Sequence, residues 1–130
     1  MTRLAHVATW TADIDRLAAF YTAYFGARAG ARYVNEAKGF ESLFLSFEGG
    51  ARLELMRTTR LTLASLEPGA ERAGLAHVAL SVGSPERVDE LTRRIAEDGH
   101  AVLDGPRLTG DGYYESVVLD PDGTRVEVTA

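Results

Sequence analysis

The sequence predicts an α+β protein built from two repeats, each with the element order β-α-β-β-β. One observation is that Leu-Ala-His-Val-Ala occurs at residues 4–8 and again at residues 75–79, 71 positions later. A second is that each copy alternates like a strand and precedes a segment with helical periodicity. A third is a glycine-containing turn late in each half, followed by a short alternating strand. Internal similarity of this kind indicates two copies of one supersecondary unit.

The first half begins with a predicted strand at residues 3–10, whose alternation places His6 and Trp10 on the same face. A helix follows, with Asp13 as its N-cap and Gly26 as its left-handed stop. The remaining elements predicted for this half are a weak strand at 31–35, a loop at 35–39, a strand at 40–47 and, after a Gly49-Gly50 turn, a strand at 51–56.

The second half repeats this order. A strand at 75–82 precedes a helix that has Ser84 as its N-cap, Pro85 at its first position and Gly99 at its end. The later elements predicted here are a short strand at 100–104, a polar loop at 105–112, a strand at 113–119 and a strand at 124–129. The repeats thus span about residues 1–58 and 74–130 of a single domain, and a connector at 59–73 is expected to hold at most a short helical turn.

The composition excludes several classes of partner and site. The net charge is −5 and the basic residues form no run, so nucleic acid is not an expected partner. The chain has no cysteine, which excludes disulfides and thiolate metal ligands. No apolar signal segment is present and no run approaches the ~20 apolar residues of a membrane helix. We therefore expect no membrane association and a cytoplasmic location.

Two histidines and two glutamates recur at matched places in the repeats. His6 lies 48 residues before Glu54, and His77 lies 50 residues before Glu127. Each glutamate follows its turn glycine by four residues and has apolar neighbours, so alternation directs the carboxylate to the face opposite the buried one. A single strand histidine or glutamate is usually structural or solvated, but that interpretation does not explain a paired recurrence. The recurrence predicts a divalent-metal site made of His6, Glu54, His77 and Glu127. The third histidine, His100, is expected at the surface.

These residues give the chain a resemblance to the vicinal oxygen chelate superfamily, in its glyoxalase I-like branch. The segments that carry it are His6, Leu53-Glu54-Leu55, Gly74-Leu-Ala-His77-Val-Ala and Asp120-Pro-Asp-Gly-Thr-Arg-Val-Glu127. The resemblance implies that the two repeats form cupped mixed sheets around an octahedral metal such as Ni, Co, Zn or Mn. It also implies a homodimer with shared sites, in which His6 and Glu54 of one chain join His77 and Glu127 of the other, and a small-molecule substrate with vicinal oxygens.

The activity that this resemblance implies is that of a lyase or isomerase of the lactoylglutathione lyase type. Glu127 is the expected catalytic base, and Glu54 is a ligand that can serve on the opposite face of the substrate. Glutathione-dependent members carry an arginine and an asparagine where this chain has Trp10 and Thr58, so the sequence argues against glutathione and leaves another thiol open. The candidate substrate-binding residues are Trp10, Thr58, Arg107 and Tyr114.

Each of these candidates also has an ordinary structural explanation. Trp10 is equally explained by core packing, and Arg107 by solvation in a loop. Tyr113 and Tyr114 project to opposite faces of their strand, and the pattern alone does not choose which one lines a cavity.

Other functions share this fold. A metal-free, ligand-sequestering protein of the bleomycin-resistance kind is one alternative, although such binders generally lack the four ligands. Ring-cleaving dioxygenases and fosfomycin-modifying thiol transferases use two histidines and one glutamate, which leaves Glu54 without a role. Acyl-CoA epimerases typically have glutamine at the position of Glu54.

Overall fold

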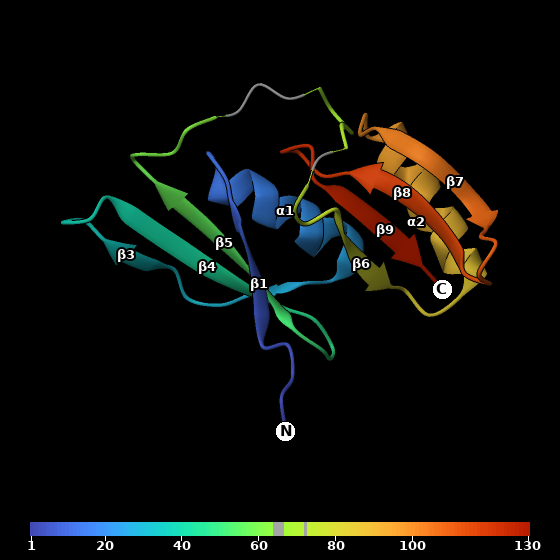
Figure 1. Cartoon of the computed structure of the whole chain (residues 1–130), viewed down its shortest axis with the longest axis horizontal. Coiled ribbons are helices and arrows are strands. Elements are labelled where there is room, and N and C mark those ends of the chain that lie inside the picture. The colour runs from blue at the N-terminus through green and yellow to red at the C-terminus, as the bar shows by residue number, and fades with distance from the viewer. Residues whose placement is uncertain (64–66, 72) are drawn as a thin grey trace. The chain divides into compact units, whose positions relative to one another are not determined.

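The computed structural model describes residues 1–63, 67–71 and 73–130. The chain divides into two compact units, Met1–Ala64 and Ser65–Ala130. In each unit a mixed sheet carries one helix on one of its faces (Figure 1). The predicted α+β class is therefore confirmed. Among the described residues, no helix is long and apolar enough to cross a membrane.

The first unit contains a sheet with the strand order β1-β5-β4-β2, and β3 also pairs with β4. Its elements are β1 (His6–Trp10), α1 (Ile14–Phe25), β2 (Arg28–Ala29), β3 (Tyr33–Asn35), β4 (Phe40–Ser46) and β5 (Arg52–Thr58). The first strand, β1, runs parallel to the last strand, β5, whereas β4 pairs antiparallel with β2, β3 and β5. The first and last strands of the unit are thus neighbours.

Helix α1 covers one face of this sheet because its apolar residues recur at helical spacing. The Asp13 side chain accepts a hydrogen bond from the backbone N–H of Arg16 at 3.0 Å, and Gly26 ends the helix with a φ of 65°. The residues buried between α1 and the sheet are Ile14, Leu17, Tyr21, Leu43, Leu45, Leu53 and Leu55. The side chains on the other face alternate with these leucines, and we call that face the helix-free face of the first unit.

The second unit has a sheet with the order β6-β9-β8-β7. Its elements are β6 (His77–Ser81), α2 (Pro85–Glu97), β7 (Val102–Leu108), β8 (Tyr114–Leu119) and β9 (Arg125–Thr129). Here too the first strand is parallel to the last, and the others are antiparallel. Ser84 caps α2 as predicted, by accepting from the backbone N–H of Arg87 at 3.2 Å. The residues buried beneath α2 are Val88, Leu91, Ile95, Val118, Val126 and Val128.

The largest difference from the sequence prediction is in β7, which continues to Leu108 through residues assigned to a polar loop. Gly105 makes this possible, since its φ is +78° and a Cβ there would lie 2.6 Å from the backbone oxygen of Glu115. The pairing with β8 shifts register on either side of Asp104, as expected for a bulged strand. The Gly105-Pro106 sequence therefore lies inside an irregular strand and does not end it.

Two smaller differences concern short segments. The two-residue strand β2 was not predicted, and the first strand begins at His6 instead of residue 3. No helix is present in the described parts of the connector, residues 59–63, 67–71 and 73. A helical turn at residues 64–66 or at residue 72 lies outside the described residues.

A buried hydroxyl pair joins α2 to its sheet. Thr92 Oγ1 donates to the backbone oxygen of Val88 at 2.6 Å and lies 2.7 Å from Ser116 Oγ. Because a hydroxyl has one proton, Ser116 is then the donor in the second contact. Thr92 and Ser116 are 5% and 1% exposed, so neither has water as a substitute partner.

We expect Thr92→Val to lower the free energy of unfolding by about 1–3 kcal/mol, since it leaves the Ser116 hydroxyl buried without an acceptor. Combining it with Ser116→Ala should recover much of that loss, because the orphaned donor is then removed as well. Urea denaturation of the two single variants and the double variant measures the coupling. The control is Thr22→Val on the exposed side of α1, with a change expected within about 0.5 kcal/mol. Additive losses would show that the two hydroxyls do not act as a pair.

Candidate metal centre

Strand pairing in the first unit brings His6 beside Glu54. Ala8 of β1 lies opposite Glu54 of β5, so His6, two residues earlier, projects from the same helix-free face as a diagonal neighbour of Glu54. His6 Nε2 is 3.6 Å from Glu54 Oε1, and the two side chains are 42% and 15% exposed. The imidazole is therefore accessible while the carboxylate is mostly enclosed.

The second unit repeats this arrangement. Ala79 of β6 lies opposite Glu127 of β9, and His77 is the diagonal neighbour of that glutamate. His77 Nε2 is 3.3 Å from Glu127 Oε1, with the side chains 41% and 25% exposed. The predicted pairing of one histidine with one glutamate thus occurs in both units, in the same geometry.

The donor atoms fit a divalent cation as half of a ligand set. Two neighbouring ligands with bonds of about 2.0–2.2 Å lie roughly 3 Å apart in an octahedral site, close to the separations seen in both pairs. Imidazole and carboxylate are suitable donors for Ni, Co, Zn and Mn. Over residues 1–63, 67–71 and 73–130, however, no group of three or more metal-ligating side chains is close enough to hold an ion. His100 follows α2, where its backbone N–H donates to Ile95, and it joins neither pair.

Aromatic side chains surround the pair of the first unit. The ring of Phe44 meets that of His6 edge-to-face at 5.3 Å, and the Arg52 guanidinium lies 4.2 Å from the centre of the Phe44 ring. This cation–π contact and the ring contact together restrict how the imidazole can rotate. Trp10, on the same face, packs edge-to-face on Phe40 at 6.3 Å and is 49% exposed.

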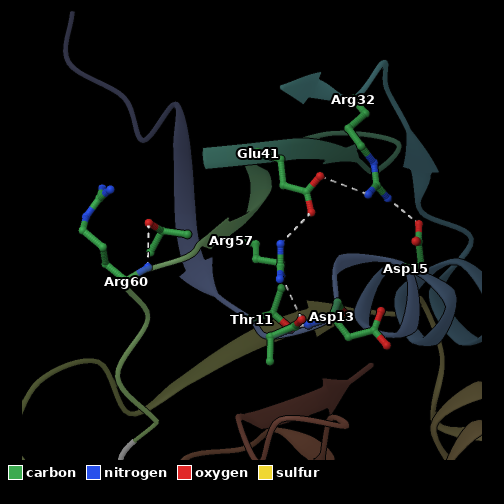
Figure 2. A network of polar contacts seen from close by, with 9 residues as sticks. Thr11, Asp13, Asp15, Arg32, Glu41, Arg57 and Arg60 are labelled. Carbon is green, nitrogen blue, oxygen red and sulfur yellow. Dashed lines mark hydrogen bonds and ion pairs between the residues drawn. The ribbon is translucent and has the colours of Figure 1, made fainter. Parts of the chain in front are cut away.

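Thr58 lies at the end of β5, opposite Phe40 of β4. It forms part of the lining of a hollow of about 190 Å³ whose other residues are Ala12, Arg57, Thr59, Leu61 and Leu63. Its hydroxyl accepts from the backbone N–H of Arg60 at 3.4 Å (Figure 2). Of the sequence candidates for substrate binding, Trp10 and Thr58 are thus both in the first unit, near its His–Glu pair.

A chain of charges anchors this end of the sheet on its other face. Glu41 of β4 lies between two arginines, 3.6 Å from Arg57 Nη1 and 3.5 Å from Arg32 Nη1 (Figure 2). Arg32 also pairs with Asp15 of α1, and Arg57 Nε donates to the backbone oxygen of Ala12 at 3.2 Å. The end of β5 is thereby tied to the start of α1.

Polar groups surround the pair of the second unit. Arg107 of β7 lies opposite Glu115 of β8, and its Nε donates to Asp104 Oδ2 at 2.5 Å. The hydrogen bond that Arg107 donates to Asp104 raises the pKa of Arg107, and the charges of Asp104, Glu115 and Glu127 add to this. Arg107 thus belongs to a strand instead of the predicted loop, on the face that carries Glu127.

Glu115 is a residue of this face that the sequence analysis missed. Burial raises the pKa of Glu115, and a hydrogen bond to Glu127 and the charge of Glu127 raise it further. Val117 pairs with Glu127 across the sheet, so Glu115, two residues before Val117, is a diagonal neighbour of Glu127. Alternation along the strand places Glu115 on the same face as Val117, and this sequence pattern was the signal that could have identified Glu115.

Tyr114 lies on the face that α2 covers. Its hydroxyl donates to Asp89 Oδ1 at 2.6 Å, and it shares its side of β8 with the buried Ser116 and Val118. Its hydrogen bond to Asp89 raises the pKa of Tyr114, with burial and the Asp89 charge as further causes. Tyr113, the other tyrosine weighed from the sequence, is 57% exposed.

Residues 3–128 match the Glyoxalase/Bleomycin resistance protein/Dioxygenase superfamily, and the chain belongs to that family. The resemblance stated from the four ligand candidates and their flanking segments is thereby confirmed. Among curated proteins, no sequence gives a significant match.

Solved structures share the fold at low identity. The trypanothione-dependent glyoxalase I of Leishmania major gives a TM-score of 0.78 at 21% identity, over 99% of this chain and 86% of that one. A glyoxylase/bleomycin resistance protein/dioxygenase domain from Frankia sp. EAN1pec gives 0.81 at 20% identity, over 99% and 97%. Glyoxalase I from Zea mays gives 0.78 at 22% identity, and there 98% of this chain matches 44% of the maize chain.

The Tyr114–Asp89 hydrogen bond predicts an alkaline titration. Because the pKa of Tyr114 is raised in the folded chain, the contact stabilises the fold below the ordinary tyrosine pKa of about 10. That contribution is lost as the pH rises through the folded-state value. We expect Asp89→Asn to lower the pKa of Tyr114, followed by ultraviolet absorbance and assigned with Tyr114→Phe. The control is Asp122→Asn, in an exposed turn of the same unit. An unchanged titration in Asp89→Asn would contradict the assignment.

Proposed function

We propose that the chain is a divalent-metal-dependent lyase or isomerase of the glyoxalase I type. The observation that carries the proposal is the repeated diagonal pair, His6 with Glu54 and His77 with Glu127, at nearly equal donor separations. Structural roles for single residues do not require the same two residue types at the same register positions in both sheets. A shared role as two halves of one ligand set does.

In this proposal the four side chains hold one cation, and the carboxylates also move protons. A divalent cation there supplies a Lewis acid for two neighbouring oxygens of a substrate. Glu127 removes the proton from the carbon that bears the hydroxyl group and returns it to the neighbouring carbonyl carbon. The hydroxyl proton moves to the former carbonyl oxygen, so the product is a neutral isomer of the substrate. The polar neighbours of Glu127 support its role as the base, since Glu115 and Arg107 lie on the same face.

The proposed assembly is a homodimer with two shared sites. Each unit contributes one His–Glu pair, and no group of three or more side chains that could hold a metal ion occurs among the described residues. A four-ligand set therefore needs a pair of each kind, and we propose that the pair of the first unit meets the second-unit pair of a partner chain. The location that we propose is the cytoplasm.

The natural substrate in this proposal is a small α-hydroxycarbonyl compound, not a glutathione adduct. The arginine and asparagine of glutathione-dependent relatives are replaced by Trp10 and Thr58, and the Thr58 hydroxyl already accepts from Arg60. Losing one charged and one neutral hydrogen bond costs about 2–4.5 kcal/mol of binding. Efficient use of glutathione therefore has little support in this chain.

Metal content tests the ligand set. We expect about one Ni, Co, Zn or Mn ion per chain in the wild type by elemental analysis, because four such donors make a high-affinity site. His6→Ala and His77→Ala should each abolish it, while the matched control His100→Ala should retain it. Stoichiometric metal in the His6→Ala/His77→Ala double variant would refute the site. Metal absent from the wild type even after reconstitution would favour the ligand-sequestering alternative.

Heterodimers test the sharing of sites. Co-expression of His6→Ala and His77→Ala chains with different tags, and purification through both tags, yields a dimer with one lesion in each chain. Sharing predicts one site with both lesions and one intact site, hence about one metal ion per heterodimer. Sites built within single chains predict none. The two tagged wild-type chains, purified in the same way, provide the reference of about two ions.

A further inference from the structure

The helix-free face of the first unit carries a row of large side chains beside its His–Glu pair. Strand pairing places Trp10 opposite Met56, Met56 opposite Ser42, and Ser42 opposite Tyr33. The row thus crosses four neighbouring strands, β1, β5, β4 and β3, which lie side by side in Figure 1. Phe40 belongs to the next row and contacts both ends, since its ring is 6.3 Å from that of Trp10 and 6.2 Å from that of Tyr33. We call Trp10, Phe40 and Tyr33 the aromatic platform.

The platform is apolar and accessible. Trp10 and Tyr33 are 49% and 54% exposed, although rings of this size are usually largely buried. Ser42, in the middle of the row, is only 5% exposed. None of the residues in the row is charged. The row of four strands spans three inter-strand distances, about 14 Å in total, which is wide enough for a planar ring system.

The platform begins one row away from the proposed ligand Glu54. Met56 follows Glu54 by two residues on the same face, a step of about 7 Å along the strand. A compound that places two oxygens at His6 and Glu54 therefore reaches the adjacent row, which contains Trp10, with atoms about 7 Å further along the strand. The rings of Trp10 and Phe40 are perpendicular, so a flat group can stack on one and meet the edge of the other.

We propose that the aromatic platform binds an aryl or similarly flat apolar group of the substrate, next to its vicinal oxygens. This rests on the proposed function only in assigning the oxygens to the His–Glu pair. Trp10 is then a specificity-determining residue, and the preferred substrates are α-hydroxycarbonyl compounds with an aromatic substituent. The charged and amide contacts that Trp10 and Thr58 lack are replaced by stacking.

A matched pair of probes tests this. Hydroxyacetone and 2-hydroxyacetophenone present the same two oxygens, but one carries a methyl group and the other a phenyl ring. We expect the phenyl compound to bind the wild-type protein about tenfold more tightly in calorimetry. Trp10 is the only tryptophan of the chain, so its fluorescence reports directly on occupation of the platform.

Variants locate the preference on the platform. Trp10→Ala should reduce the phenyl preference to about twofold or less, whereas Trp10→Phe should retain part of it because a ring remains. Tyr33→Ala should weaken binding of the phenyl compound while leaving the fluorescence of Trp10 as a second readout. The control is Val34→Ala, which is adjacent to Tyr33 and 53% exposed but projects from the opposite face of β3.

The outcomes separate this inference from the proposed function. Equal affinity for the two probes, or a phenyl preference that survives Trp10→Ala, would overturn the inference whatever the metal content. A preference without a change in Trp10 fluorescence would also overturn it, because the phenyl ring would then lie elsewhere. Repeating the titrations with metal-free His77→Ala protein should weaken both probes and preserve their ratio. If the protein binds no metal but shows the phenyl preference, the inference about the platform stands and the proposed enzymatic function is refuted.

Discussion

Parallel pairing of the first and last strands is the constraint on which each unit depends. It joins β1 to β5 and β6 to β9, and so brings together segments almost fifty residues apart. Because the register sets Ala8 opposite Glu54 and Ala79 opposite Glu127, each histidine lies on the same face as its glutamate. A slip of one residue would turn the imidazole toward the helix and remove the pair entirely.

The helix-free faces of the two units carry their His–Glu pairs in the same strand register, but the side chains around the two pairs differ. Glu54 lies opposite Phe44 and two residues before Met56 on the same face, where the Arg52 guanidinium is engaged with the Phe44 ring. Glu127 lies next to Glu115, in a row that continues to Arg107. Glu54 therefore has mainly uncharged side chains on either side of it, whereas Glu127 has an acidic neighbour followed by a basic one. The asymmetry gives a physical reason to distinguish the two glutamates that the repeat alone does not provide.

Sequence patterns predicted most of the fold because the decisive signals are local. The caps Asp13 and Ser84 and the stop at Gly26 specify the helices through backbone hydrogen bonds within one turn. The irregular part of β7 escaped because its continuation depends on Gly105 passing close to Glu115, a contact absent from the local sequence. Likewise, β2 is too short to show alternation. The His–Glu pairs were predictable from the repeat, and Arg107 was already a candidate from the sequence. That Arg107 and Glu115 lie on the same sheet face beside Glu127 depends on which strands pair, which alternation alone does not give.

The position of Trp10 shows how the helix-covered face supports the other one. The backbone N–H of Thr11 donates to the oxygen of Met56 at 2.8 Å and extends the β1–β5 ladder one residue beyond Trp10. Arg57, the next residue of β5, donates a hydrogen bond to the backbone oxygen of Ala12 and pairs with Glu41. These contacts fix the end of β5 on the helix-covered face. Trp10 and Met56 therefore lie where the backbone is held from two sides. A surface fixed in advance loses less conformational entropy when a ligand stacks on it, so rigidity on the helix side favours binding on the helix-free side.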